Sequence, residues 1–209
     1  MSSRGDTRPR ITVVGLGPAG PELLTSEVRA CLDSGRPVLL RTERHPAVAA
    51  VEAATAYDRF YEDADTFDEV YARIVDDVVD RARAAGEVVY AVPGSPNVAE
   101  RTVELLRRRN DIDLDVRPSV SCLDLAWLVL GIETMVEAVT IVDGREFAVA
   151  AAGHTGPFLV TQVHSAEVLV EILDVLDDVP TRVTVLQRLG LSDQRVEALT
   201  GRNPRPDIE

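Results

Sequence analysis

The sequence predicts an α/β protein in which a mostly parallel sheet, covered by helices on both faces, is followed by a second, smaller α/β unit. Three observations carry this prediction. Strand-like and helix-like segments alternate along the first 118 residues, as they do in parallel sheets. Apolar residues make up 45% of the chain, an ordinary value for a globular core. After about Pro118 the pattern changes to short strand candidates around one long helical stretch.

The first four elements are predicted from apolar runs and from the glycine and proline residues that bound them. Residues 10–15 (RITVVG) form a short apolar run that ends in glycine, which indicates a buried strand. A helix is expected over 21–32, because proline suits the first turn of a helix. Residues 37–40 are expected to form the second strand, and 46–54 a further helical stretch.

The clearest helix is predicted over Thr66–Ala85. Thr66 and Glu69 have the spacing of a capping box, and Gly86 suits the end of the helix. Apolar residues then recur every three or four positions, which predicts one buried face. Those residues are Phe67, Val70, Tyr71, Ile74, Val78 and Ala82.

The remaining elements complete the alternation. In the first half they are a strand over 87–92, a helix over 97–109 capped by Asn97 and Glu100, a strand over 112–116 and a helix over 121–130 capped by Ser121. In the second half the strand candidates are 139–142, 158–163, 183–187 and 195–199, with a helix over 166–176. We therefore expect a disordered lead-in at 1–9, an N-terminal domain at 10–118, a C-terminal domain at 119–200 and an unstructured tail at 201–209.

Composition and charge exclude several classes of function. The net charge of −13 would repel a phosphate backbone, so nucleic acid is not an expected partner. No apolar run approaches the ~20 residues of a membrane helix, and the N-terminus lacks the apolar stretch of a signal peptide, so we expect a cytoplasmic protein. All 22 basic residues are arginine, which excludes a P-loop and a pyridoxal-phosphate Schiff base. The cysteine and histidine spacing predicts no metal site.

A glycine-rich loop follows the first strand. Residues 15–20 (GLGPAG) match the G-x-G-x-x-G pattern of dinucleotide-binding loops, which leaves an NAD(P) oxidoreductase open as one hypothesis. Pro18 and Pro21 count against it, because each removes a backbone N–H donor. Arg41 also stands where an acidic residue would bind the ribose. The alternative is a glycine turn that only reverses the chain.

A second turn, 92–96 (VPGSP), joins a buried strand to a helix at the sheet edge where ligands bind in such folds. Ser95 lacks the flanking glycines of a nucleophile elbow, because Pro93 and Asn97 take their places. The stiff turn suits a cationic or adenosine ligand as well as it suits a plain turn. Ser121 has a simpler interpretation, because serine is a good helix cap. Cys31 and Cys122 are both interpreted as buried core thiols.

Taken in order, these motifs resemble those of the tetrapyrrole methylases, the class III S-adenosylmethionine (SAM) methyltransferases. The ordered set is 14–25 (VGLGPAGPELLT), the P-G-x-P turn, a P-x-x-S before a helix and, near the end, 193–196 (DQRV). Segments 41–46 (RTERHP), 91–96 (AVPGSP) and 161–163 (TQV) are most similar to the methylase-like domain fused to MazG pyrophosphohydrolases. The resemblance covers roughly 10–199.

The resemblance implies two α/β domains with SAM in the cleft between them, and usually a homodimer. It also implies which positions contact the cofactor, chiefly through the backbone. In this sequence those positions are Pro18, Pro93, Gly94, Ser95, Val98, Ser121, Cys122, Val163 and Leu189.

Several acidic residues of the family pattern are replaced in this chain. Gly20 and Ser95 stand where the family's loops carry aspartates, and Arg41 stands where some members carry an aspartate base. The comparison therefore supports cofactor binding better than tetrapyrrole catalysis, and it assigns no catalytic residue. The cluster after the second strand either lines an acceptor site for an anionic small molecule or is a solvated turn; its members are Arg41, Glu43, Arg44 and His45.

Three functions therefore remain open from the sequence. The leading one is a SAM-dependent methyltransferase with an unknown small-molecule acceptor. The second is a non-catalytic SAM-binding or dimerisation module that partners a MazG-type nucleotide pyrophosphohydrolase domain. The third is the NAD(P) oxidoreductase, which depends on the glycine loop alone.

Overall fold

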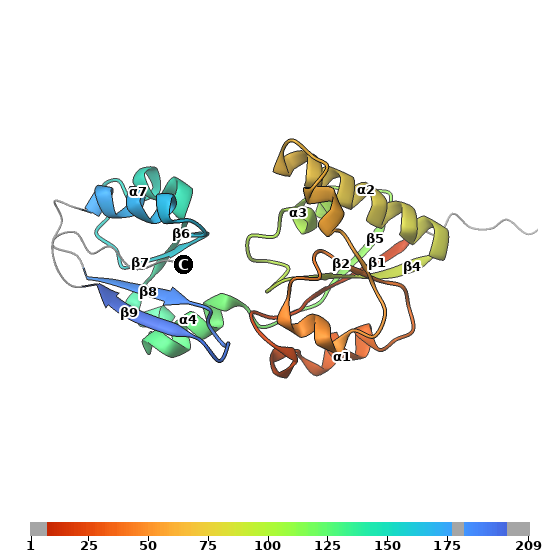
Figure 1. The fold of residues 1–209 in the computed structure, drawn as a ribbon, viewed down its shortest axis with the longest axis horizontal. Coiled ribbons are helices and arrows are strands. Elements are labelled where there is room, and N and C mark those ends of the chain that lie inside the picture. The colour runs from red at the N-terminus through yellow and green to blue at the C-terminus, as the bar shows by residue number, and fades with distance from the viewer. Residues whose placement is uncertain (1–7, 177–181, 200–209) are drawn as a thin grey trace, which may run out of the picture. The chain divides into compact units, whose positions relative to one another are not determined.

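The computed structural model describes residues 8–176 and 182–199, which divide into two compact units (Figure 1). The first unit runs to Leu125 and includes Leu189–Ser192; the second begins at Ala126, runs to Arg188 and resumes at Asp193. The predicted tail lies outside the described residues, as does the predicted lead-in up to residue 7.

The first unit contains a five-stranded, fully parallel sheet with the strand order β3-β2-β4-β1-β5. The predicted parallel sheet is thus confirmed. Its central pair, β1 and β4, is in register from Arg10 opposite Glu87 to Gly15 opposite Val92. The strands are β1 (Arg10–Gly15), β2 (Val38–Leu40), β3 (Thr55–Ala56), β4 (Glu87–Val92) and β5 (Asp113–Val116).

Helices cover both faces of this sheet (Figure 1). Successive side chains of a strand point to opposite faces. On β1, Ile11 and Val13 therefore enter the core formed with α2 (Phe67–Ala85) and α3 (Arg101–Arg107). Val14 enters the core on the other face, with α1 (Ser26–Leu32). Because both faces are buried, the strands have apolar runs rather than alternating patterns.

Helix α2 follows the sequence prediction closely. The Thr66 hydroxyl accepts from the backbone N–H of Glu69 at 3.3 Å, and Gly86 ends the helix with a φ of +84°. Of the predicted face, Val70, Ile74, Val78 and Ala82 are buried, whereas Tyr71 is half-buried and Phe67 is 60% exposed. Phe67 lies in the first turn, and its ring stacks on Tyr71 at the surface.

The helix predicted over 21–32 is divided in two. A 3-10 turn at Pro21–Leu23 comes first, and α1 starts only at Ser26. The hydroxyl of Thr25 accepts from the backbone N–H of Val28 at 3.2 Å. Thr25 therefore caps a new helix, which fixes extended backbone between the two segments.

Two other predicted helices are shorter than expected. The stretch 46–54 forms a 3-10 helix at Pro46–Ala50 and then the short strand β3, which the sequence analysis missed. The helix predicted over 97–109 is α3, and Glu100 alone caps it. Asn97 is not a cap; its side-chain oxygen accepts from Arg107 at 2.7 Å.

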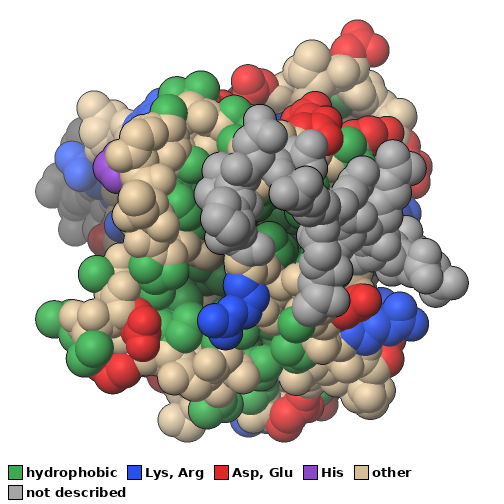
Figure 2. Space-filling view, turned by 90° about the vertical axis from the view of Figure 1, so that its left-hand side faces the viewer, with side chains coloured by type: hydrophobic (Ala, Val, Ile, Leu, Met, Phe, Trp, Pro, Cys, Tyr) green, Lys and Arg blue, Asp and Glu red, His purple; other side chains and the backbone are tan. Residues whose placement is uncertain are grey.

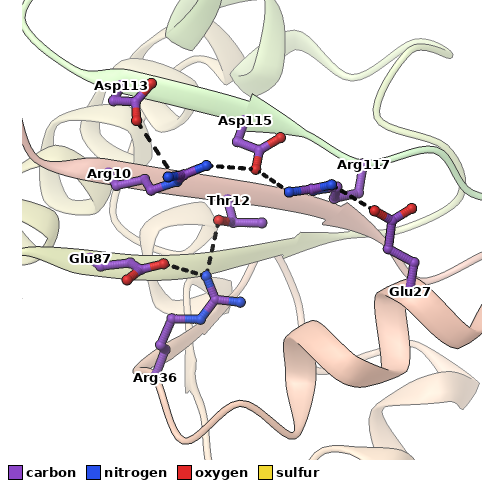
Figure 3. Close-up of polar contacts among 8 residues, drawn as sticks. All are labelled: Arg10, Thr12, Glu27, Arg36, Glu87, Asp113, Asp115 and Arg117. Atoms are coloured by element: carbon purple, nitrogen blue, oxygen red, sulfur yellow. Dashed lines mark hydrogen bonds and ion pairs between the residues drawn. The ribbon is translucent and has the colours of Figure 1, made fainter.

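A strip of polar contacts runs along the α1 side of the sheet (Figure 3). Arg117 bridges Asp115 of β5 (2.5 Å) and Glu27 of α1 (2.6 Å). This contact ties the edge strand to the helix. The strip contains Arg10, Thr12, Glu27, Arg36, Glu87, Asp113, Asp115 and Arg117.

The second unit is smaller. Strands β6 (Thr140–Asp143) and β7 (Phe158–Thr161) form a parallel pair, and β8 (Val183–Gln187) pairs with β9 (Arg195–Leu199) in an antiparallel hairpin. Its core joins β6 to two helices through Val142, Phe147, Val168 and Ile172. The unit's helices are α5 (Thr134–Glu137), α6 (Phe147–Ala150) and α7 (Ala166–Leu176); α4 (Cys122–Leu130) begins in the first unit and continues into the second.

The prediction of α7 and of all four strands in this half is confirmed. The helices α5 and α6 were missed, because four residues are too few to show a helical period. Within residues 8–176 and 182–199, no helix is both long and apolar enough to cross a bilayer. Across those same ranges, no cluster of three or more cysteine, histidine or acidic side chains is arranged to hold a metal ion.

Candidate functional site

The sheet of the first unit has a topological switch point between β1 and β4. These strands are parallel neighbours, so their carboxyl ends lie at the same edge. After β1 the chain leads to α1 on one face, and after β4 it leads to α3 on the other. Where neighbouring connections diverge in this way, an open α/β sheet forms the crevice in which ligands bind.

Three loops meet at this edge. The loop after β1 pairs with the loop after β4 through two backbone hydrogen bonds, from Gly17 N to Gly94 O (3.1 Å) and from Gly94 N to Gly17 O (2.8 Å). The loop after β5 joins them, because the hydroxyl of Ser119 donates to the same Gly94 carbonyl at 3.2 Å. Hydrogen bonds to two other loops therefore hold the backbone of the turn.

Gly94 is the open point of this arrangement. It adopts a φ of +64°, a left-handed conformation that favours glycine. A Cβ added to Gly94 would meet no atom within 4 Å. The turn after β4 is thus held by hydrogen bonds on the side that contacts Gly17. On the side where a Cβ of residue 94 would project, the space is open.

The structure gathers most of the predicted cofactor residues around these loops of the first unit. Gly190 places the segment Leu189–Ser192 beside the β1 loop, since a Cβ there would lie 3.0 Å from the Cβ of Ala19. Val163 belongs to the second unit, in the loop after β7. The members in the first unit are Pro18, Pro93, Gly94, Ser95, Val98, Ser121, Cys122 and Leu189.

The two serines of this set already have structural contacts. Ser121 caps α4 as predicted: its hydroxyl accepts from Leu123 N (2.9 Å), and its own N–H donates to Asp124 (2.7 Å). Ser95 is buried, with Asn97 N 3.5 Å from its hydroxyl oxygen. Neither contact involves a general base, so the loops are suited to binding through the backbone rather than to nucleophilic catalysis.

The interpretation of Cys122 as a core thiol is wrong. Cys31 is buried as expected, but Cys122 is exposed, because it occupies the first position of α4. Partial burial of the sulfur nevertheless raises the pKa of the Cys122 thiol. The thiol therefore stays protonated near neutral pH, which is unfavourable for a nucleophile.

The predicted acceptor cluster after β2 divides into separate contacts. Asp58 organises its outer part by accepting from the hydroxyl of Thr42 (2.6 Å) and the backbone N–H of Glu43 (2.8 Å). Arg44 is exposed and lies 3.7 Å from the same carboxylate. Burial acts to raise the pKa of Asp58, but these hydrogen bonds and the charge of Arg44 outweigh it, so the pKa is lowered. Asp58 therefore stays ionised and holds the segment.

Arg41 points inward instead. Its side chain is 15% exposed, and its Nε lies 3.4 Å from the Glu100 carboxylate, which is 7% exposed. The guanidinium also lies over the rings of Tyr61 (5.2 Å) and Tyr71 (5.0 Å). In this structure the arginine balances a buried carboxylate and stacks between two aromatic rings.

His45 connects the same segment to the glycine loops. Its Nδ1 accepts from the backbone N–H of Ala47 at 3.2 Å, and the ring also hydrogen-bonds to the backbone of Gly17. Burial lowers the pKa of His45 below its ordinary 6.5, and the contact with Gly17 opposes only part of that effect. The neutral imidazole therefore links the β2 loop to the pair formed by Gly17 and Gly94.

This lowered pKa predicts a pH dependence of stability. Below pH 6.5 the unfolded chain takes up a proton at His45 before the folded chain does, so stability falls as the pH drops through the folded pKa. His45→Asn should keep the helix cap, because asparagine is a good cap, and should remove this proton uptake. Urea unfolding at pH 7.5 and 5.5 should show a smaller loss of stability for H45N than for the wild type. Equal losses would contradict the assignment.

The comparison with known families decides the identity of this fold. The family model of the tetrapyrrole (corrin/porphyrin) methylases matches residues 10–204, nearly the whole chain. The chain belongs to the tetrapyrrole methylases. The resemblance inferred from the ordered motifs is thereby confirmed at the level of the family.

Relatives of this tetrapyrrole methylase add the following. The uncharacterised protein YabN of Bacillus subtilis (strain 168) is 33% identical over 180 residues, which are 81% of this chain and 36% of YabN. The chain therefore spans about a third of that relative. Among solved structures, the methyltransferase CobJ superposes with a TM-score of 0.69 at 18% identity, covering 91% of this chain and 85% of that one.

A second solved structure is uroporphyrin-III C-methyltransferase from Thermus thermophilus, in complex with S-adenosylhomocysteine. It matches with a TM-score of 0.63 at 22% identity, covering 90% of this chain and 87% of that one. At these identities the two solved structures confirm the predicted α/β fold of this tetrapyrrole methylase.

Sequence reasoning missed several residues that shape this tetrapyrrole methylase's site. Glu100 was assigned to a helix cap, and its ion pair across the sheet edge has no local signal. Asp58 follows a two-residue strand that the apolar pattern did not show. Ser119 lies inside the P-x-x-S motif, so the sequence does contain a signal for it, although the motif was interpreted through Ser121 alone. All three act through contacts with residues more than 10 positions away.

Proposed function

We propose that this tetrapyrrole methylase is a cytoplasmic SAM-dependent methyltransferase whose small-molecule acceptor is unknown. Family membership supports the proposal, as does a structural relative in complex with S-adenosylhomocysteine. The observation that carries it is the turn at Gly94, fixed to Gly17 at the switch point and open on its other side. The proposal keeps the domain boundaries at 10–118 and 119–200.

The proposed SAM site consists of the residues that the resemblance indicates. Methyl transfer is an in-line displacement at a sulfonium carbon, which requires alignment of donor and acceptor and no covalent protein intermediate. A site built from rigid backbone suits this chemistry, because carbonyl oxygens stabilise the positive sulfonium. The proposed contacts are Pro18, Pro93, Gly94, Ser95, Val98, Ser121, Cys122, Val163 and Leu189.

Calorimetry with S-adenosylhomocysteine tests the proposal directly. We expect saturable binding of one ligand per chain and no binding of NADP under the same conditions. Binding of NADP alone would instead favour the oxidoreductase suggested by the G-x-G-x-x-G pattern. Binding of neither ligand would contradict the proposed cofactor.

A glycine pair sharpens this test. Gly94→Ala should weaken S-adenosylhomocysteine binding at least tenfold, because the new methyl group enters the space proposed for the ligand. Gly35→Ala is the matched control: Gly35 has a φ of +74° and equally open space around its Cβ position, in a turn before β2. Both variants should lose about 1 kcal/mol of stability from the left-handed backbone. Equal affinities of G94A and G35A would contradict the proposed site.

The acceptor proposal concerns the segment after β2. We propose that an anionic small molecule binds beside Arg44 and His45. Arg44 is the exposed cation of the cluster, and His45 is the member that lies at Gly17 of the glycine loop. Arg41 would contribute positive charge from a buried position, whereas Glu43 is exposed and its carboxylate would limit how much negative charge the site accepts. An RNA acceptor is disfavoured by the net charge of −13.

A homodimer is part of the proposal. Figure 2 shows hydrophobic side chains exposed on the surface of the second unit. In that unit Leu128 is 77% exposed, Val136 79% and Met135 88%. A partner that covered such apolar surface would remove it from water. Sedimentation velocity should give about twice the chain mass of 22.7 kDa. A single species at the monomer mass would contradict a dimer.

The alternative proposal is a non-catalytic SAM-binding or dimerisation module beside a MazG-type nucleotide pyrophosphohydrolase domain. It is supported by the ion pair of Arg41 with Glu100, since Arg41 stands where some family members carry an aspartate base. S-adenosylhomocysteine binding without methyl transfer to any offered acceptor would favour this alternative.

A further inference from the structure

The loop Pro93–Glu100 combines the proposed cofactor contacts with backbone strain. It begins at Gly94, whose positive φ costs little, and it ends at Ala99, which has a φ of +52°. An alanine in this conformation is disfavoured and persists only when its surroundings fix it. Ala99 is itself exposed, so the restraint must come from its neighbours in the chain.

The next residue supplies that restraint. The carboxylate of Glu100 accepts from the backbone N–H of Thr102 (3.2 Å) and from its hydroxyl (2.7 Å). The Thr102 oxygen lies 2.9 Å from the hydroxyl of Tyr90 on β4, and both of these residues are fully buried. A chain of hydrogen bonds therefore links the end of the loop to the strand from which the loop starts.

Arg41 closes the connection from the neighbouring strand. Its backbone N–H donates to Ala91 of β4 at 2.9 Å, just before the loop begins. Its side chain reaches Glu100, where the loop ends. The two tyrosine rings that flank the guanidinium limit its alternative positions. One arginine thus contacts both the root and the end of the loop.

We infer that the ion pair of Arg41 and Glu100 is a clamp that holds the loop Pro93–Glu100 in its ligand-binding conformation. Arg41 is then a positioning residue, not a catalytic one, since it acts on the ligand through the loop. The inference deepens the proposed function and rests on it only for the identity of the ligand.

The test uses Glu100→Gln, which removes the charge and keeps an oxygen for Thr102. Its matched control is Glu104→Gln on the same helix, where an exposed carboxylate pairs with Arg101 and Arg108. Hydrogen exchange of the full chain without ligand, read on a peptide spanning 94–101, should be about tenfold faster in E100Q than in the wild type and unchanged in E104Q. Affinity for S-adenosylhomocysteine should fall about tenfold in E100Q alone.

The two readouts keep this inference separate from the proposed function. If the wild type does not bind S-adenosylhomocysteine, the proposed function fails, while the exchange measurement still decides on the clamp. A folded E100Q with wild-type exchange over 94–101 would overturn the clamp. Should E100Q not fold, Arg41→Gln removes the other charge of the ion pair, and the same exchange comparison applies to it: faster exchange over 94–101 supports the clamp, and wild-type exchange overturns it.

Discussion

Gly15→Ala should be one of the most destabilising single substitutions in the first unit, at about 3 kcal/mol or more. Gly15 is the last residue of β1 and lies where the three loops of the site converge. A Cβ there would overlap the Ser119 hydroxyl and the Gly94 carbonyl oxygen, and would lie 2.7 Å from Cδ of Pro96. The free energy of unfolding in urea measures the effect.

A second variant distinguishes whether the Ser119 side chain or the Gly94 carbonyl causes the loss of stability in G15A. The Ser119 side chain can rotate away, but the Gly94 carbonyl cannot move without breaking its bonds to Gly17 and Ser119. Adding Ser119→Ala to G15A should therefore recover little stability. Full recovery would show that the side chain, and not the backbone of the turn, sets the limit at Gly15.

Arg41→Ala should cost about 3 kcal/mol or more, because it leaves the Glu100 carboxylate buried without a counter-charge. The loss of stacking on Tyr61 and Tyr71 adds to this cost. Thermal and urea unfolding of the variant would measure it. Exposed arginine pairs offer a contrast, since Arg108→Ala at the end of α3 should change stability by less than about 1 kcal/mol.

A double-mutant cycle distinguishes charge from packing at this position. Introducing Glu100→Gln into R41A removes the unpaired charge, so the double variant should be more stable than R41A alone. The residual loss then reports the missing contacts between the guanidinium and the rings. If E100Q lowered the stability of R41A further, the ion pair would not be the source of the loss.

The sequence predicted elements well where the signal is local. The cap at Thr66, the apolar period of α2 and the strand 87–92 each depend on residues within one or two turns, and the structure confirms them. Of the predicted capping box only the Thr66 half is seen, since the Glu69 carboxylate lies near Arg73. Predictions were wrong where a local cap competed with a longer pattern. Thr25 starts a new helix within the apparent helix 21–32 in this way.

The candidate site was predictable only in part for a related reason. Glycine and proline turns at strand ends are visible in the sequence, and the parallel sheet necessarily brings Gly17 and Gly94 to one edge. The partner of Arg41 is not visible, because Glu100 lies 59 positions away and resembles an ordinary helix cap. Ion pairs across a sheet edge depend on strand order, which the local pattern does not specify.

The charged strip beside α1 also bears on aggregation. Strand β5 is an edge of the sheet, and edge strands present free backbone groups to which another chain can add. Asp113 and Asp115 line one side of β5, and Arg10 and Arg117 hold them there. An incoming strand would have to approach past this row of ionised groups. The charged strip therefore disfavours pairing of β5 with a strand of another molecule at high protein concentration.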